Sequence, residues 1–366
     1  MLNHSLALLI SIAALLIFLR LKLHPGLAIF AGSILLALLV LPPLSIPSLM
    51  GRTLVDFQTL RLLAIIACAL TLSRLMEVKG LLTSLAATIE RIGPKFAMHF
   101  VPAIIGLVPM PAGALVSAAA LKDLTERMRL RPEQATFINF WFRHLWEYSL
   151  PVYPAIIAAS VILSMPLSSL VTTLLPVTGL AIAFGSVSSY RILKGKKTQE
   201  LEQEATGSIA RNLIRAAWPV LLVVLLVLLG LDAAIAFPVT LLLLALQQRA
   251  KWPELKESLK YGLGPKMLFL LYAVMLYKAV IETSGTAQTL FSDMQNIGLP
   301  QLVILIVLPL LAGFSTGLSI AFVGISFPLL VERFAGEAYS RTAIAPLMGL
   351  ITILGYPMQN QAQWVS

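Results

Sequence analysis

The chain has 366 residues, of which 58% are hydrophobic and 12% are charged, and its mean hydropathy is +0.89. A soluble domain needs more polar residues than this to cover its surface, so the composition excludes one. The net charge of +10 lacks a basic patch interleaved with aromatic residues, which excludes nucleic-acid binding and favours basic loops beside a membrane. With one cysteine, Cys68, and four scattered histidines, we expect no disulfide within the chain, no metal site and no cofactor.

Unbroken apolar runs recur along the chain and are long enough to cross a bilayer as helices, whereas a transmembrane barrel would alternate apolar and polar residues. We therefore expect an all-α polytopic membrane protein with about nine spans, at residues 5–22, 26–44, 60–78, 134–164, 167–190, 212–230, 231–247, 264–283 and from 343 onward. Amphipathic segments are expected at 46–59, 81–96, 249–262 and 285–297.

Two more apolar stretches, 99–120 and 299–330, are interrupted by proline and glycine. We expect each to form a re-entrant helical hairpin, because broken helices survive in a bilayer only inside protein or beside a water-filled cavity. The final span is expected to be short, since only Met-Gln-Asn-Gln-Ala-Gln-Trp-Val-Ser follows Tyr356-Pro357.

Basic residues set the expected orientation. If the N-terminus lies outside the cell, the predicted inside loops hold eighteen of the 27 Lys and Arg residues; these loops are 20–25, 79–98, 121–133, 191–211 and 248–262. This bias predicts a multi-pass protein of a bacterial or archaeal inner membrane, with its N-terminus outside and loop 191–211 in the cytoplasm.

The two halves of the chain repeat each other at an offset of about 200 residues. Four short matches occur in order: Glu77–Gly80 with Glu282–Gly285, Ile92-Gly93 with Ile297-Gly298, Val108–Gly113 with Leu308–Gly313, and Tyr153-Pro154 with Tyr356-Pro357. One extra span separates the halves, so the second is inverted relative to the first. The expected organisation is a first repeat at 1–166, a link at 167–211 and a second repeat at 212–366.

Broken helices at equivalent repeat positions are typical of the binding sites of secondary transporters. Glycine lets the backbone approach a ligand closely, and the free N–H groups of a half-helix N-terminus attract anions. The predicted binding residues of the hairpin tips are Pro109, Pro111, Ala112, Gly113, Ser117, Gly313, Ser315, Thr316, Gly317 and Ser319, with a possible sodium site at Gly113, Ser315 and Thr316. Alternatively, the hydroxyls satisfy backbone groups freed by the breaks.

A polar cluster lies inside the predicted span 134–164, where charge is expensive and usually functional or paired. Its predicted site residues are Arg143, His144, Glu147, Tyr148, Ser149 and Tyr153. Arg143 and Glu147 are four residues apart, which places both on one face of a continuous helix. One interpretation is a structural ion pair. The other is that Arg143 or His144 binds an anion while Glu147 carries a proton.

Other polar and aromatic residues lie near the predicted span ends. Glu77 and Glu282 are expected to act as interfacial caps or loop contacts, and Lys278 is expected to extend its amine towards the interface. The five tryptophans are expected mostly to anchor spans at the interface: Trp141, Trp146, Trp218, Trp252 and Trp364.

The motifs Pro109-Met-Pro-Ala-Gly113, Arg143-His-Leu-Trp-Glu-Tyr148, Pro151-Val-Tyr-Pro154 and Gly313-Phe-Ser-Thr-Gly317 carry a resemblance to the ion transporter superfamily. That superfamily includes divalent-anion/sodium symporters, gluconate permeases, C4-dicarboxylate carriers and arsenite carriers. Within it the chain resembles an integral membrane family defined by a domain of unknown function. The resemblance implies two re-entrant hairpins, a homodimer and elevator-like movement. The chain lacks the hairpin Ser-Asn-Thr of sodium/dicarboxylate members.

These features predict a secondary active transporter of a small, carboxylate-like organic anion, coupled to protons or sodium. A channel or a lipid-carrier flippase on the same scaffold is the alternative, and a membrane enzyme is a remote one. The chain has no phosphate-binding Gly-x-x-x-x-Gly-Lys-Ser/Thr motif and no His-Glu-x-x-His motif, so we expect no catalytic residues. The expected partners are a small anionic substrate, the lipid bilayer and a second copy of the chain.

Overall fold

The computed structural model describes residues 3–81, 93–109, 113–196, 206–298 and 319–334, together with the single positions 307, 309 and 311. All regular elements in these ranges are helices, and the ranges contain no strand, which confirms the all-α prediction for them. Three helical runs are long and apolar enough to cross a membrane: Phe57–Val78 (α4), Leu167–Leu193 (α11) and Trp252–Ser284. The number of spans and the inverted repeat stay predictions.

The run Trp252–Ser284 consists of two helices, Trp252–Gly262 (α14) and Pro265–Ser284 (α15), which are separated at Gly264. A helix of 33 residues is about 50 Å long, far more than the roughly 30 Å of a hydrocarbon core. Because α14 carries four charged residues and α15 is apolar over most of its length, α15 is the membrane-crossing part.

The chain divides into two compact units, and each is described separately. The first comprises the described parts of 1–66, 154–173 and 263–366, and the second those of 67–153 and 174–262. Helices α4 and α11 each run from one unit into the other.

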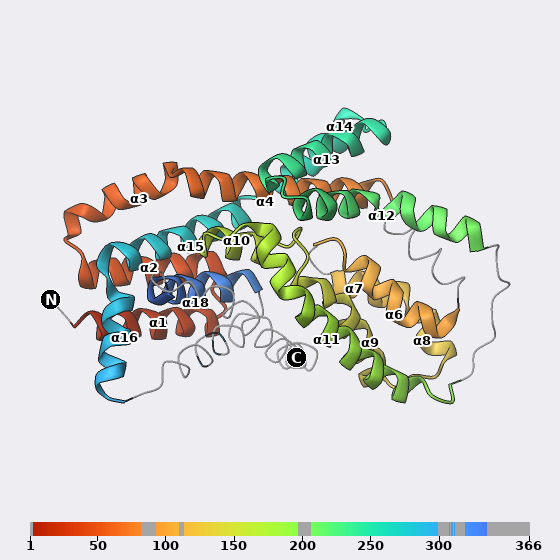
Figure 1. Cartoon of the computed structure of the whole chain (residues 1–366), viewed down its shortest axis with the longest axis horizontal. Coiled ribbons are helices and arrows are strands. Elements are labelled where there is room, and N and C mark those ends of the chain that lie inside the picture. Colours follow the sequence, from red (N-terminus) through yellow and green to blue (C-terminus); the bar gives the residue numbers. More distant parts are fainter. Residues whose placement is uncertain are drawn as a thin grey trace. The chain divides into compact units, whose positions relative to one another are not determined.

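The first unit is built on tightly packed apolar helices (Figure 1). Helix α2 packs between α1 and α15, and α15 also packs against α18. Glycines allow these approaches: a Cβ at Gly26 would lie 3.1 Å from Leu270 Cα, and one at Gly324 would lie 2.3 Å from Val274 Cγ2. The helices of this unit are α1 (His4–Arg20), α2 (Pro25–Val40), η1 (Pro43–Ser45), α3 (Ile46–Val55), α10 (Pro154–Ile162), α15, α16 (Thr286–Asn296) and α18 (Ser319–Phe334).

The second unit holds the first predicted hairpin and the polar cluster. A close contact joins α14 to the second half of α4, because a Cβ at Gly262 would lie 2.0 Å from Thr71 Oγ1 and 2.4 Å from the Ala67 carbonyl oxygen. Ion pairs strengthen this contact, since Arg74 binds Glu257 at 2.5 Å. Its other helices are α6 (Pro94–Ile105), α7 (Gly113–Ala120), α8 (Lys122–Arg127), α9 (Pro132–Arg143), η2 (Leu145–Tyr148), α12 (Thr206–Leu228) and α13 (Ala233–Gln247).

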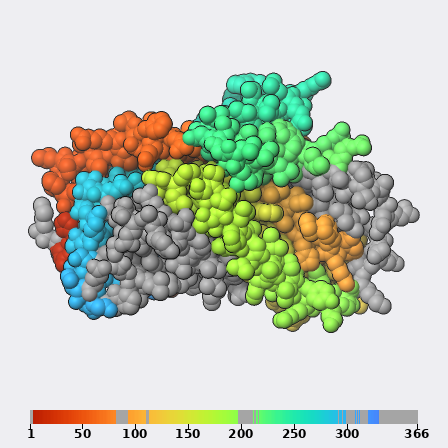
Figure 2. Space-filling view, viewed as in Figure 1, coloured from red at the N-terminus to blue at the C-terminus, as the bar shows by residue number. Residues whose placement is uncertain are grey.

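Large apolar side chains on the long helices of the second unit are left uncovered. Leu180 and Phe184 on α11 are 60% and 59% exposed, and Leu242 on α13 is 60% exposed. In the space-filling view the side chains of α12 and α13 lie at the surface (green to teal, Figure 2). Exposed apolar area of this kind is costly in water and favourable against lipid tails, so these faces are suited to a bilayer.

Ion pairs and hydrogen bonds add detail to the expectations for residues near the predicted span ends. Glu77 and Glu282 each pair with a basic residue one turn earlier, Arg74 at 2.7 Å and Lys278 at 2.8 Å, so Lys278 is held by an ion pair. The interfacial position of the tryptophans stays a prediction, and Trp141 and Trp146 are half-buried in the structure. Both indole N–H groups donate to backbone carbonyls inside the second unit.

Candidate functional site

The helix break predicted at Pro109–Gly113 separates α6 from α7, which pack against each other and against α9. The break begins after Ile105, where α6 ends, and α7 begins at Gly113. Proline cannot donate a backbone hydrogen bond and glycine tolerates a close approach, which explains a break at this sequence. The remaining tip residues Met110, Pro111 and Ala112 lie outside the described residues.

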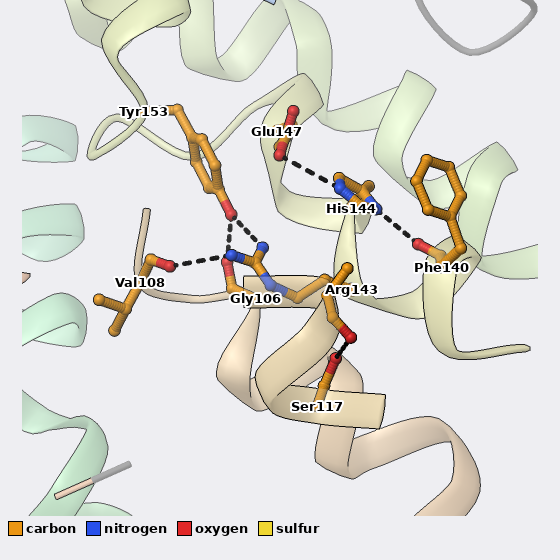
Figure 3. A network of polar contacts seen from close by, with 9 residues as sticks. Gly106, Val108, Ser117, Phe140, Arg143, His144, Glu147 and Tyr153 are labelled. Atoms are coloured by element: carbon orange, nitrogen blue, oxygen red, sulfur yellow. Dashed lines mark hydrogen bonds and ion pairs between the residues drawn. The ribbon is translucent and has the colours of Figure 1, made fainter. Parts of the chain in front are cut away.

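Three side chains satisfy carbonyl groups at and just after the end of α6, and Figure 3 shows two of them, Arg143 and Tyr153. Trp146 Nε1 donates to the Ala103 carbonyl at 2.6 Å, and the Tyr153 hydroxyl donates to the Gly106 carbonyl at 2.5 Å. Arg143 Nη2 donates to the Val108 carbonyl at 3.3 Å. All three come from residues 143–153, from the last residue of α9 to the residue before α10, so this segment and the hairpin form one polar structure in the second unit.

Arg143 is the last residue of α9, and its side chain enters the gap between α6 and α7. It is 3% exposed, and Nη1 donates to the Tyr153 hydroxyl at 3.0 Å. Gly113 is required for this position, because a Cβ there would lie 2.2 Å from Arg143 Nη2 and 2.6 Å from Nε. The guanidinium therefore lies against the first residue of α7, with no side chain between them.

The Arg143 guanidinium lies near two helix ends of opposite polarity, the end of α6 and the start of α7. The carbonyl groups at the end of α6 favour a cation, while the N–H groups at the start of α7 favour an anion. A guanidinium alone beside the start of α7 meets an unfavourable helix dipole. An anion bound at this place would interact favourably with both Arg143 and the α7 N-terminus.

The predicted span 134–164 is broken after Arg143. Helix α9 ends at Arg143, the 3-10 helix η2 covers Leu145–Tyr148, and α10 starts at Pro154. The expectation that Arg143 and Glu147 share the face of one α-helix is therefore wrong. At this point the His144 ring contacts the Phe140 carbonyl through Nδ1 at 2.7 Å, and the His144 N–H donates to the Trp141 carbonyl at 3.3 Å, not to Phe140 as a continuing α-helix would require.

The tight turn of η2 brings Glu147 back towards His144. Glu147 Oε1 lies 3.8 Å from His144 Nε2, and the two side chains are 11% and 12% exposed. A carbonyl oxygen only accepts hydrogen bonds, so the contact with Phe140 assigns a proton to His144 Nδ1. His144 Nε2 and the Glu147 carboxylate therefore face each other as two groups that can bind a further proton.

Helix α9 contributes a residue that the sequence interpretation missed. Asn139 lies one turn before Arg143, is 8% exposed, and donates from Nδ2 to the Ala114 carbonyl at 2.9 Å. Ser117 donates to the same carbonyl at 3.2 Å. An asparagine within an otherwise apolar run was the available signal, because a buried amide needs a partner.

The remaining predicted site residues lie partly beside the polar cluster and partly elsewhere in the chain. Ser149 is buried and its hydroxyl lies 2.7 Å from Thr178 Oγ1 of α11. Pro109 and Tyr148 are buried beside the cluster, and Ser319 is the first residue of α18 in the other unit. Gly313, Ser315, Thr316 and Gly317 lie outside the described residues, as do the possible sodium ligands among them. In the part of the chain that the structure describes, no three His, Cys, Asp or Glu residues group as a metal site would require.

The helices and their exposed apolar faces define a helical membrane protein whose second unit contains a buried polar hairpin site. The chain belongs to the family described as "Protein of unknown function (DUF401)", whose model matches residues 3–359. Among curated proteins, none matches the chain.

Proposed function

We propose that this protein is a secondary active transporter of a small organic anion, built as two inverted repeats and related to the ion transporter superfamily. The observation that carries the proposal is the placement of Arg143. Its buried guanidinium lies against Gly113 at the start of α7 in a break between two helices. A planar guanidinium matches the two oxygens of a carboxylate, and the start of α7 adds backbone N–H groups.

The pair His144 and Glu147 supports proton coupling. One nitrogen of the imidazole donates to the Phe140 carbonyl, and the other faces Glu147 at 3.8 Å. Arg143 directly precedes His144 in the sequence, so a proton shared by this pair lies near the charge of Arg143. Binding of an anion at Arg143 offsets the positive charge that opposes protonation, so anion and proton binding favour each other. Sodium coupling at the hairpin tips is the alternative.

Two structural similarities between the halves support the inverted repeat. The series α1, α2, α3 and α4 and the series α12, α13, α14 and α15 share one order: two apolar helices, a short amphipathic helix and a long helix. Positive φ angles occur at equivalent glycines, with φ of 67° at Gly80 and 62° at Gly285, and of 155° at Gly93 and 71° at Gly298. Such conformations favour glycine, so both halves keep the residue where the turn needs it.

The functional test is anion exchange across proteoliposomes that contain the purified protein. Wild-type protein should exchange a labelled carboxylate such as succinate, gluconate or lactate. Arg143→Lys should lose exchange, because an ammonium group cannot reproduce the planar fork. Arg52→Lys is the matched control, since Arg52 is exposed on α3. Unchanged exchange by Arg143→Lys rules out Arg143 as the anion ligand.

The proton-coupling step has its own test. Glu147→Gln should still bind and exchange the anion but should not accumulate it in response to a pH gradient. Full proton-driven uptake by Glu147→Gln would make the His144 and Glu147 pair structural. Transport that requires sodium at every pH would assign coupling to the hairpin tips.

The architecture is tested by cysteine labelling in a Cys68→Ser background. Ala112→Cys and Ala312→Cys should react with a membrane-impermeant maleimide through water, because re-entrant tips line an aqueous path. Labelling of the two ends of stretch 99–120 should occur from the same side of the membrane. Ends that label from opposite sides would contradict the hairpin.

A further inference from the structure

Asn139 has a buried hydrogen-bond acceptor that the described residues leave unsatisfied. Its Nδ2 atom donates to the Ala114 carbonyl, while Oδ1 has no hydrogen-bond partner in the part of the chain that the structure describes. The reverse orientation of the amide would place two acceptors against each other, so the Ala114 contact fixes which atom is free. Leaving a buried acceptor unpaired costs free energy of folding, which calls for an explanation at this position.

The free acceptor lies one helix turn before Arg143 on α9. Asn139 binds the carbonyl of Ala114, and Arg143 lies against the neighbouring residue, Gly113. Both side chains come from one face of α9, since residues four apart in a helix are neighbours. The start of α7, a helix of eight residues, is therefore flanked by a cation and by a neutral oxygen that accepts a hydrogen bond.

We propose that the substrates are hydroxy acids, and that Asn139 is the residue that recognises their hydroxyl group. This inference rests on the proposed function. The carboxylate binds Arg143 and the α7 N-terminus, and a hydroxyl on the substrate donates to Asn139 Oδ1. A plain carboxylate leaves this acceptor unpaired. An amino acid supplies a donor but brings its ammonium group beside the Arg143 cation, which is unfavourable.

Recognition of the substrate hydroxyl by Asn139 is selective because both the hydroxyl and Asn139 Oδ1 are buried in the complex. A site that hydrogen-bonds a substrate hydroxyl discriminates strongly against the analogue that lacks it, since the polar group of the site then stays unpaired. Hydrophobic pockets give no such discrimination between analogues that differ by one hydroxyl. The ratio between a hydroxy acid and its deoxy analogue is therefore the diagnostic quantity.

The test uses anions in matched pairs on the intact protein in detergent, with isothermal titration as the readout. The pairs are lactate and propionate, malate and succinate, and gluconate and hexanoate. In the pair whose length fits the site, the hydroxy acid should bind at least about 10-fold more tightly than its analogue. Asn139→Ala should reduce this ratio to near one while the deoxy anion keeps its affinity. Ser258→Ala, which removes a buried hydroxyl and its hydrogen bond to the Glu254 carbonyl on α14, should keep the ratio.

The outcomes separate this inference from the proposed function. Equal binding within every pair by the wild-type protein overturns hydroxyl recognition and leaves anion transport standing. An unchanged ratio in a folded Asn139→Ala variant assigns the hydroxyl to another residue and overturns the role of Asn139. If Asn139→Ala does not fold, Asn139→Leu, which also removes Oδ1 but keeps a similar side-chain volume, should lose the preference for the hydroxy acid, and a retained preference overturns the role of Asn139. Binding of none of the six anions contradicts the proposed function itself.

Discussion

Replacement of Gly113 by alanine tests whether the Arg143 guanidinium is held at the start of α7. The new Cβ would lie 2.2 Å from Nη2, 2.6 Å from Nε and 2.8 Å from Cζ. Comfortable contact requires about 3.5 Å, so the guanidinium must move by roughly 1 Å. The hydrogen bond from Nη2 to the Val108 carbonyl is already 3.3 Å long and would be lost.

The magnitude follows from the charge of the donor. A hydrogen bond that involves a charged group contributes about 1.5–3 kcal/mol, which sets the expected loss in the free energy of unfolding. Anion affinity at Arg143 should fall as well, because the displaced guanidinium no longer lies against the start of α7. Unfolding in detergent measures the first quantity and anion titration measures the second.

A double-mutant cycle makes the result specific. In an Arg143→Ala background the methyl group has room, so Gly113→Ala should cost nothing further, and the coupling should be about 1.5–3 kcal/mol. Gly179→Ala on α11 is the control, because nothing lies within 4 Å of its Cβ. Equal costs of Gly113→Ala in both backgrounds would refute the contact between Gly113 and Arg143.

Three further predictions concern the second unit and the topology. Trp146→Phe should lower the free energy of unfolding by about 1 kcal/mol through loss of the hydrogen bond to the Ala103 carbonyl. Trp252→Phe is the control, because this side chain is 68% exposed and its replacement should leave thermal unfolding unchanged. Equal effects of the two substitutions would show that Trp146 does not stabilise the fold in this way. Gly262→Ala should cost about 1–3 kcal/mol in the same assay because α14 must move away from α4, whereas Gly51→Ala, with open space around it, should not destabilise the protein. A reporter enzyme inserted in loop 191–211 should be active only in the cytoplasm, and activity outside the cell would reverse the topology.

The sequence predicted the break in 99–120 and the polar cluster well, because proline, glycine and buried charge have strong local consequences. It could not predict where α9 ends. That boundary depends on His144, whose contact with the Phe140 carbonyl and approach to Glu147 form only in the folded chain. Residues 134–164 read as one predicted span, so the sequence alone indicated a continuous helix through Arg143 and Glu147.

Contacts between residues that are far apart in the chain could not be predicted from the sequence either. Trp146 and Asn139 have ordinary interpretations in a membrane sequence, as an interfacial anchor and as an isolated polar residue. Their roles follow from the carbonyls of Ala103 and Ala114, which the hairpin brings beside α9 and η2. Tertiary partners of this kind leave no periodic signal in the sequence.

The most direct test of the account is concentrative uptake by purified wild-type protein in proteoliposomes under an imposed pH gradient. A labelled carboxylate that the protein exchanges should accumulate inside above its external concentration, and the accumulation should collapse when a protonophore dissipates the gradient. Flux that only equalises the two concentrations, with or without ion gradients, would indicate a channel and contradict the proposed secondary active transporter.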